Sequence, residues 1–307
     1  MAPRSRRIAP TWIAVDWRES GMLAWALDDN DRVLMKARSA QGLAMIESGQ
    51  FEAALIRLID PWLLLPTTPV LVGGIADLTE IASQVPVIDL PHRLSDAEPI
   101  SVSVQDRRLR MFALPGLRTH DPLVSASSKE PLARALASEQ PGFDGILFIP
   151  GPSSRWLRLS HGALTDVENF VTEQVTELFS TKFSIKNSLT AGNVDLAAFD
   201  AALDDAMEPG THLGGQFSRI WSEAASPEAD GAASLGRLLG FCIGMEMAGA
   251  RHLRAGLPVV VTMTGEHWTL YVRALRRMGA EVAVRDADEM ALAGLKQAFH
   301  GLTEAVA

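Results

Sequence analysis

Cysteine is nearly absent from this chain of 307 residues, in which Cys242 is the one example. A lone thiol excludes a disulfide within the chain and a zinc or iron–sulfur site built from cysteines, and it fits a reducing compartment. The seven histidines include no pair at the i, i+4 spacing of a helical metal site. Each is therefore expected to be a surface or hydrogen-bonded side chain rather than a metal ligand.

Long apolar runs are also missing. The most apolar stretch, 238–247, contains Glu246 and is far shorter than the roughly 20 residues that span a bilayer. The basic segment 1–10 lacks the apolar core of a signal peptide, so we expect a cytoplasmic protein with no membrane partner. Acidic residues outnumber basic ones by 37 to 28, and the net charge of −9 disfavours a nucleic-acid partner because it repels the phosphate backbone.

Four common catalytic signatures are absent as well: the GxxxxGK(S/T) phosphate loop, GxGxxG, GxSxG and HExxH. Their absence argues against the usual P-loop, Rossmann, α/β-hydrolase and zinc-protease classes.

The first third of the chain has the pattern of an antiparallel β-meander followed by a helix and another strand. Apolar alternation and turn residues predict strands at 11–17, 22–27 and 32–37, a helix at 45–59, a buried strand at 70–72 and a hairpin across 100–112.

A similar order begins again in the second half. The patterns predict strands at 145–149, 155–159 and 163–165, a helix at 166–183, and then helix 232–255, strand 258–263, helix 266–278, strand 281–284 and helix 287–302. Alternation of helix and strand favours parallel pairing and an α/β fold. The length suits two domains, and the Pro115-Gly116 turn places them at 1–116 and 117–307.

The predicted helix 232–255 carries Gly236, Gly240 and Gly244 at four-residue intervals. Small residues on one face let another backbone approach closely. Two interpretations stay open at this point: close helix packing, or a face that borders a nucleotide.

Two loops that open the two halves carry the chemistry. Asp16 lies at the end of the first predicted strand, before a turn that contains Ser20. A carboxylate at such a position can orient a hydrated Mg²⁺, and the N–H and hydroxyl groups of the turn can contact phosphate. An ordinary turn without a ligand would use the same residues. The second loop offers Gly151, Ser153, Ser154 and Arg155 as phosphate-binding groups.

Motifs along nearly the whole chain resemble one family, the 2-keto-3-deoxygalactonate kinases (2-dehydro-3-deoxygalactonokinases) of the actin, sugar kinase and heat-shock ATPase superfamily. The resemblance rests on IAVDW at 13–17, Ala24-Trp25, 73–75, 115–117, Pro150-Gly151, Arg155-Trp156, 164–166, 176–178, 240–248 and 271–279.

The resemblance implies two ribonuclease-H-like (actin-like ATPase) domains, each opening with a β-meander, around a central cleft. It implies ATP and Mg²⁺ as cofactors and a 2-keto-3-deoxy sugar acid as the small-molecule partner. On this basis Asp16 is expected to hold the metal, Gly240 and Gly244 to border the nucleotide, and Gly74 and Ile75 to contact the substrate. Glu130 and Asp121 are the two candidates for the general base. The oligomeric state is left open, a homodimer included.

The two loops depart from the family pattern. Arg18 stands where the family has glycine, Glu19 replaces a hydroxyl residue, and Pro152 and Ser153 replace Thr and His. Phosphoryl transfer depends on positioned donors, and losing one typically costs ~100-fold or more in rate. Two hypotheses therefore stand: an ATP-dependent sugar-acid kinase, and an inactive family member that binds a sugar acid or nucleotide as a sensor or partner protein.

Overall fold

The computed structural model describes residues 9–78, 81–121, 124–125, 127–182, 194–208, 213–226, 228–254 and 256–306. Contacts divide the chain into two compact units. Unit 1 comprises Met1–Phe143, Leu159–Val167 and Ala287–Ala307, and unit 2 comprises Asp144–Arg158 and Glu168–Asp286. This division by contacts is not a test of domain boundaries, and the boundary expected after Gly116 stays a prediction.

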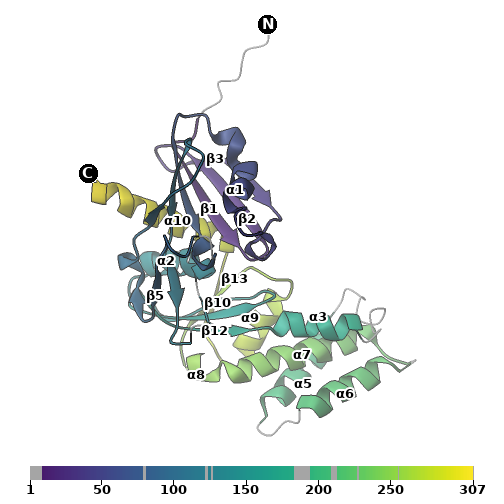
Figure 1. Ribbon diagram of the computed structural model, residues 1–307. Coiled ribbons are helices and arrows are strands. Elements are labelled where there is room, and N and C mark those ends of the chain that lie inside the picture. The colour runs from purple at the N-terminus through teal and green to yellow at the C-terminus, as the bar shows by residue number, and fades with distance from the viewer. Residues whose placement is uncertain are drawn as a thin grey trace. The chain divides into compact units, whose positions relative to one another are not determined.

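Unit 1 is built on a six-stranded sheet with the order β3-β2-β1-β4-β8-β7 (Figure 1). Its strands are β1 (Trp12–Arg18), β2 (Gly21–Leu27), β3 (Val33–Ser39), β4 (Thr68–Gly73), β7 (Ile100–Val102) and β8 (Leu109–Ala113). The first three strands are antiparallel neighbours, whereas β1, β4 and β8 run parallel. The predicted meander and the hairpin of β7 with β8 are confirmed.

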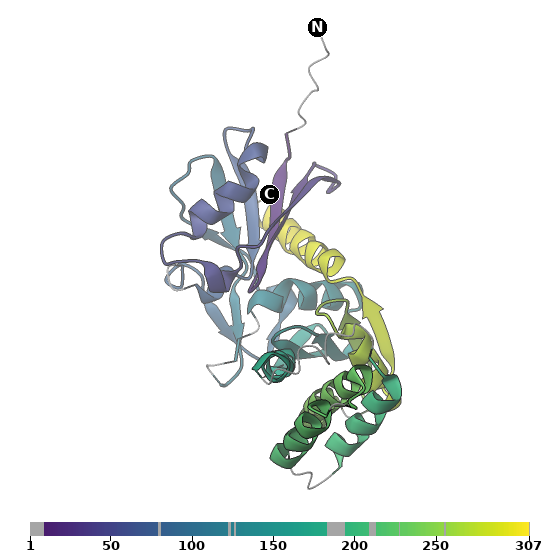
Figure 2. The same cartoon turned by 90° about the vertical axis from the view of Figure 1, so that its right-hand side faces the viewer.

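Helices cover both faces of this sheet (Figure 2). Ile13, Val15 and Trp17 share a hydrophobic core with helix α1 (Phe51–Ile59). The alternate residues of β1 point to the other face, because successive side chains of a strand alternate. There Trp12 stacks on Phe299 of helix α10 (Ala287–Val306), with ring centroids 4.0 Å apart. Asp16 and Arg18 lie on this α10 face.

The smaller elements of unit 1 surround the sheet. They are the short strands β5 (Val87–Asp89), β6 (His92–Arg93) and β9 (Gly116–Arg118), helix α2 (Glu130–Glu139), and the 3-10 turns η1 (Leu43–Met45), η2 (Asp60–Trp62), η3 (Ile75–Asp77), η4 (Leu94–Asp96) and η5 (Ser127–Lys129). Helix α2 packs against α10 on the face that carries Asp16.

Unit 2 contains a sheet part in the order β14-β13-β10-β11. Its strands are β10 (Asp144–Ile149), most of β11 (Ser154–Ser160), β13 (Val259–Thr262) and β14 (Val282–Arg285); β12 (Ala163–Phe170) begins in unit 1, where it pairs with β6. Strands β10, β13 and β14 are parallel, as the alternation of helix and strand predicts. The helices in the described part of the unit are α3 (Thr172–Lys182), α5 (Leu196–Met207), α6 (Leu213–Ala224), α7 (Gly231–Gly249), α8 (Arg251–Arg254) and α9 (Trp268–Arg277).

Three predicted helices have different limits in the structure. The helix predicted from residue 45 begins at Phe51, because Gly49 has a left-handed φ of 79°. The helix predicted from residue 166 begins at Thr172, since β12 continues to Phe170, and its predicted last residue, Phe183, lies outside the described residues. The long helix predicted to 255 ends at Gly249, where a side chain would lie 2.8 Å from Phe170.

The structure also adds helices α5 and α6, which the sequence patterns did not predict. Among the described residues, none of the helices combines the length and the apolarity needed to cross a bilayer.

Candidate functional site

The carboxyl ends of β1 and β4 meet at one edge of the unit 1 sheet, where Asp16 is the register partner of Gly73. Glycine is required at this edge. A Cβ on Gly74, whose φ is 96°, would lie 2.1 Å from the carbonyl oxygen of Trp17, and one on Gly73 would lie 2.7 Å from Pro131 of α2. The two glycines therefore let both strand ends and the start of α2 converge beside Asp16.

Asp16 is fully buried, with 0% of its surface exposed. Its Oδ2 accepts a hydrogen bond of 2.5 Å from Arg18 Nε, whereas its Oδ1 is buried without a partner in the described part of the chain. A buried carboxylate oxygen without a hydrogen bond is costly. Its chemistry fits a magnesium ion or a water ligand of that ion, so Asp16 fits the metal that the family resemblance implies.

Arg18 links Asp16 to the first turn of α10. Its Nη2 donates to Asp288 Oδ1 at 2.8 Å, and Asp288 Oδ2 also contacts Lys36 Nζ at 3.2 Å and the guanidinium of Arg38. Burial alone would raise the pKa of Asp288, but the hydrogen bond from Arg18 and the neighbouring cations lower it overall. Burial lowers the pKa of Arg18, but the neighbouring carboxylates of Asp16 and Asp288 raise it by more, so the net effect is a raised pKa.

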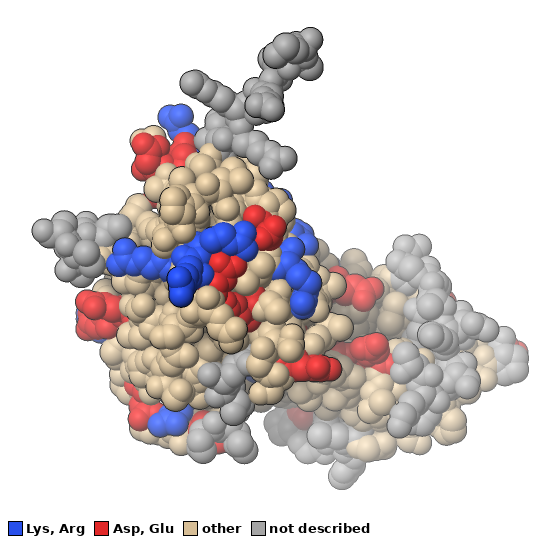
Figure 3. Space-filling model, turned by 45° about the horizontal axis from the view of Figure 1, so that its top comes forward, with Lys and Arg blue, Asp and Glu red and all other residues tan. Residues whose placement is uncertain are grey.

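This acidic and basic cluster extends to the surface. Lys36 and Arg38 on β3 are 41% and 64% exposed. Figure 3 shows one face of the molecule, on which Lys and Arg side chains gather beside Asp and Glu. Within the described residues there is no group of three or more His, Cys, Asp and Glu side chains placed to hold a metal.

The remaining unit 1 candidates differ in exposure. Ser20 is exposed in the turn between β1 and β2. Ile75 is fully buried in the core at η3, although its neighbour Gly74 lies at the edge beside Trp17 and Ser128. The edge of the sheet thus brings Asp16 and Gly74 together, while the side chain of Ile75 belongs to the core.

Glu130 begins α2 and is fully buried. Burial raises the pKa of this carboxyl, and Arg134 opposes the rise. Its Oε1 accepts a hydrogen bond from Arg134 Nε at 2.7 Å, and Arg134 also donates to Gln297 of α10 at 3.0 Å and to the carbonyl of Ala97 at 2.6 Å. Glu130 thus holds Arg134 within α2, and Arg134 in turn joins α2 to α10 through Gln297. A role of Glu130 as general base stays a prediction.

The second candidate loop joins β10 to β11 in unit 2. Ser154 is fully buried, and its hydroxyl donates to Glu246 Oε1 of α7 at 2.6 Å. The same carboxylate accepts from Trp156 Nε1 at 2.8 Å and from the hydroxyl of Tyr271 at 2.8 Å. Because a serine hydroxyl has one proton to donate, the Ser154 side chain serves the interior of the unit.

The rest of this loop stays near the surface, where Ser153 and Arg155 are half-buried. It packs against a segment that the sequence analysis did not single out. A Cβ on Gly265, whose φ is 72°, would lie 2.6 Å from Glu173 Oε1 and 3.1 Å from the backbone nitrogen of Gly151. The two glycine backbones therefore touch. Gly265 lies two residues after the end of the predicted strand 258–263, and this glycine was the signal that could have identified the contact.

Glu173 lies beside this glycine contact, with its Oε1 buried and unpartnered in the described part of the chain. Burial raises the pKa of Glu173, a backbone hydrogen bond from His267 opposes the rise, and the charges of Glu266 and Glu246 add to it. The carboxyl beside the second loop is therefore easier to protonate than an exposed glutamate.

The glycine face of α7 packs against α5. A Cβ on Gly240 would lie 2.2 Å from the carbonyl oxygen of Phe199, and one on Gly244 would lie 2.7 Å from the Cβ of Ala206. The structure thus gives both glycines the role of close helix packing, and the space expected for a nucleotide beside them is filled by α5.

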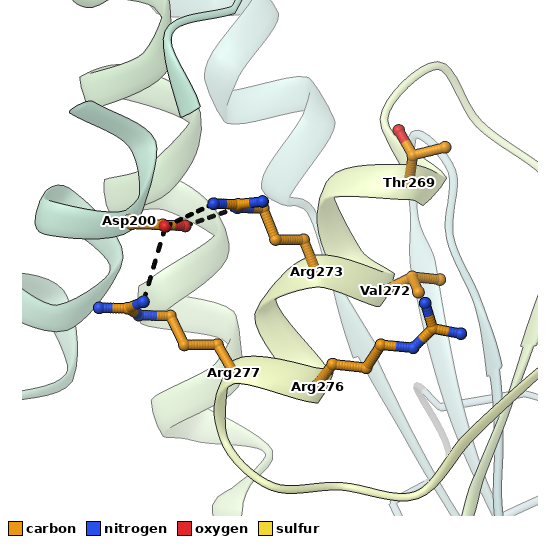
Figure 4. Close-up of a pocket in the computed structure, with 6 residues that line it drawn as sticks. All are labelled: Asp200, Thr269, Val272, Arg273, Arg276 and Arg277. Atoms are coloured by element: carbon orange, nitrogen blue, oxygen red, sulfur yellow. Dashed lines mark hydrogen bonds and ion pairs between the residues drawn. The ribbon is translucent and has the colours of Figure 1, made fainter. Parts of the chain in front are cut away.

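Unit 2 also has a hollow of about 470 Å³ between α5 and α9, away from the predicted site residues (Figure 4). Its lining consists of Asp200, Thr269, Val272, Arg273, Arg276 and Arg277. Arg273 makes two hydrogen bonds to Asp200, at 2.7 and 2.6 Å, and Arg277 pairs with Asp204. These pairs tie the two helices together.

Comparisons with known proteins agree with the family resemblance. The model of a family described as 2-keto-3-deoxy-galactonokinase matches residues 16–298. A probable 2-dehydro-3-deoxygalactonokinase of Rhizobium meliloti (strain 1021) is 28% identical over 301 residues, which cover 95% of this chain and 97% of the relative.

Two solved structures are similar in fold. One is a Sinorhizobium meliloti protein assigned as a 2-dehydro-3-deoxygalactonokinase, with a TM-score of 0.83, 23% identity, and coverage of 95% of this chain and 99% of that one. The other is the activator of the 2-hydroxyisocaproyl-CoA dehydratase from Clostridium difficile, with a TM-score of 0.50, 11% identity, and coverage of 96% of each chain. The α/β, actin-like ATPase fold class expected from the sequence is confirmed, and a cleft between two domains stays a prediction.

Proposed function

The chain belongs to the 2-keto-3-deoxy-galactonokinase family, and from this premise we propose that it transfers the γ-phosphate of ATP to a 2-keto-3-deoxy sugar acid such as 2-dehydro-3-deoxygalactonate. Membership makes it a carbohydrate kinase, an ATP-dependent phosphotransferase. ATP and Mg²⁺ are the cofactors of this proposal, and the sugar acid is its small-molecule partner.

Asp16 is the observation that supports the proposal most directly. It is a buried carboxylate at the carboxyl edge of the unit 1 sheet, and one of its oxygens has no partner in the described residues. Asp16 would hold a divalent metal ion at the strand end, and that ion would supply positive charge to stabilise the phosphate during transfer. We assign Asp16 to the metal.

The phosphate contacts are assigned to the two loops. Ser20 is exposed in the first, and Ser153 and Arg155 are half-buried in the second, where the backbone of Gly151 adds an N–H group. The Ser154 hydroxyl donates to the buried Glu246, so Ser154 is assigned to positioning the loop backbone and not to contacting phosphate. Gly74 is assigned to the substrate because it lies at the same sheet edge as Asp16, and Ile75 supports it from the core.

Glu130 is the proposed base that accepts the proton of the sugar hydroxyl. Burial raises the pKa of this carboxyl, which moves a glutamate toward the basicity that a general base needs at neutral pH. In the structure Arg134 holds one of its oxygens, while Oε2 has no partner among the described residues.

A coupled assay with ATP, Mg²⁺ and a panel of keto-deoxy sugar acids tests the proposal. We expect turnover with at least one sugar acid, and Asp16→Asn should lower kcat by ~100-fold or more, because it removes the charge that holds the metal. Asp89→Asn is the control, since Asp89 is an exposed acid paired with Arg118, and its kcat should match that of the unmodified protein. Binding of ATP or a sugar acid without any turnover would contradict the kinase and support the binding-only hypothesis.

A further inference from the structure

We propose that Arg18 is a built-in counter-cation that competes with the divalent metal ion for Asp16, so that the Arg18 side chain must leave Asp16 before the metal binds fully. This inference rests on the proposed function, since it concerns the same carboxylate. It assigns a gating role to Arg18, which the proposed function leaves without one.

The geometry places the guanidinium on the same carboxylate that the proposed metal would use, one oxygen away from the unpartnered one. Arg18 Nε lies 2.5 Å from Asp16 Oδ2, which is the oxygen that has a partner, while Oδ1 is buried and without one in the described part of the chain. Asp16 has 0% exposure and the Arg18 side chain has 24%. The carboxylate is therefore enclosed, and of the two paired side chains only the arginine reaches solvent.

A second carboxylate holds the other end of the guanidinium. Arg18 Nη2 lies 2.8 Å from Asp288 Oδ1, and Asp288 is itself held by Lys36 and Arg38. A side chain held at both ends has less freedom to move, and a charge-assisted hydrogen bond is about twice as strong as a neutral one. The arrangement is therefore a clamp across β1, β3 and α10.

The positive charge of Arg18 lowers the affinity of Asp16 for a second cation. A carboxylate paired with a guanidinium carries little net charge for a second cation, and the two cations repel each other at a separation of a few ångströms. Removing the positive charge of Arg18 should therefore raise the affinity of Asp16 for a divalent ion, whereas removing a more distant charge of the same cluster should not.

Four variants of the full-length chain test the gating role, with Mn²⁺ alone as the probe and free Mn²⁺ measured by electron paramagnetic resonance. Arg18→Gln removes the charge but keeps most of the stem, and Arg18→Lys keeps the charge. Arg38→Gln is the matched control, because Arg38 contacts Asp288 and not Asp16. The double variant Asp16→Asn, Arg18→Gln shows whether Asp16 is the ligand.

We expect Arg18→Gln to bind Mn²⁺ ~10-fold or more tightly than the unmodified chain. Arg18→Lys and Arg38→Gln should stay within about 2-fold of it, and the double variant should lose the gain. Equal affinity of Arg18→Gln and the unmodified chain would overturn the inference, as would a gain that persists without Asp16. Circular dichroism checks that each variant folds, and Arg18→Gly is the replacement if the glutamine variant does not.

The same variants separate this inference from the proposed function. Mn²⁺ binding is measured without a sugar acid, so it is independent of turnover. If the variants show the expected order of Mn²⁺ affinities but the unmodified chain turns over none of the sugar acids, the counter-cation is supported and the kinase is contradicted. Turnover by the unmodified chain with an unchanged Mn²⁺ affinity in Arg18→Gln would support the kinase and contradict the counter-cation.

Discussion

Glu246 is a buried carboxylate whose removal should destabilise unit 2 more than that of any exposed acid in it. Its side chain accepts hydrogen bonds from Ser154 at 2.6 Å, from Trp156 at 2.8 Å and from Tyr271 at 2.8 Å. These donors come from β11 and α9, while Glu246 lies on α7, so one carboxylate joins three elements. Glu246→Ala is the perturbation that tests this role.

The expected magnitude follows from the donors that the alanine leaves behind. Glu246→Ala leaves three buried donors, those of Ser154, Trp156 and Tyr271, without this acceptor. Each unpaired donor costs about 1–3 kcal/mol, and the loss of a buried charge offsets part of that cost. We therefore expect Glu246→Ala to lower the free energy of unfolding by about 3–5 kcal/mol.

Glu246→Gln separates the hydrogen bonds from the charge. The amide oxygen can still accept from Ser154 and Trp156, and the amide nitrogen can donate to the hydroxyl oxygen of Tyr271, so all three contacts can be kept as weaker neutral bonds. The cost should then be about 1–2 kcal/mol.

Urea unfolding, followed by circular dichroism and by tryptophan fluorescence, measures these differences, and coincidence of the two signals tests whether unfolding is two-state. Glu281→Ala is the control, because Glu281 is exposed in the same unit, and it should change stability by less than about 0.5 kcal/mol. The reasoning is refuted if Glu246→Ala costs less than about 1 kcal/mol, or if the alanine and glutamine variants cost the same.

Two further predictions concern packing and pH. Gly240→Ala should lower the stability by about 1–3 kcal/mol in urea unfolding, since its Cβ would lie 2.2 Å from the carbonyl of Phe199, whereas Gly142→Ala, with open space around its Cβ, should change it little; equal effects would contradict the helix contact. The raised pKa of Glu173 means that the folded state binds its proton more tightly than the unfolded state, so its contribution to stability is greatest below the unfolded pKa and is lost as pH rises through the folded pKa. Glu173→Gln should therefore gain stability relative to the unmodified chain as pH rises above 4.5, the ordinary pKa of a glutamate. A pH-independent difference between their unfolding midpoints would contradict the assignment.

Local sequence patterns anticipated the order of elements because strands and helices have short periods. The alternation in 11–17 and the short apolar segment 22–27 were enough to predict two strands with Asp16 near the turn between them, and β1 and β2 form this hairpin. The limits of the helices were harder to predict. Residues 167–170 continue a strand although their apolar spacing also fits a helix, because short apolar segments satisfy both periods.

The glycine spacing of α7 predicts that a helix face is closely packed, but not which element packs against it. Gly236, Gly240 and Gly244 predict a face that another backbone approaches, and this face exists. The spacing could not say what approaches it, and α5, which the patterns did not predict, is the element that does.

The sequence by itself determined the α/β order, the family and the position of Asp16 at a strand end, since each follows from neighbours along the chain. Only the tertiary structure decided what Asp16 contacts. Asp288 is 270 residues away from Arg18, yet α10 places it against the same guanidinium, and Ser154 turns to Glu246, 92 residues later, and into the interior. Hydrogen bonds and ion pairs between distant residues depend on how helices pack on a sheet, and that packing sums many weak contacts which no single segment encodes.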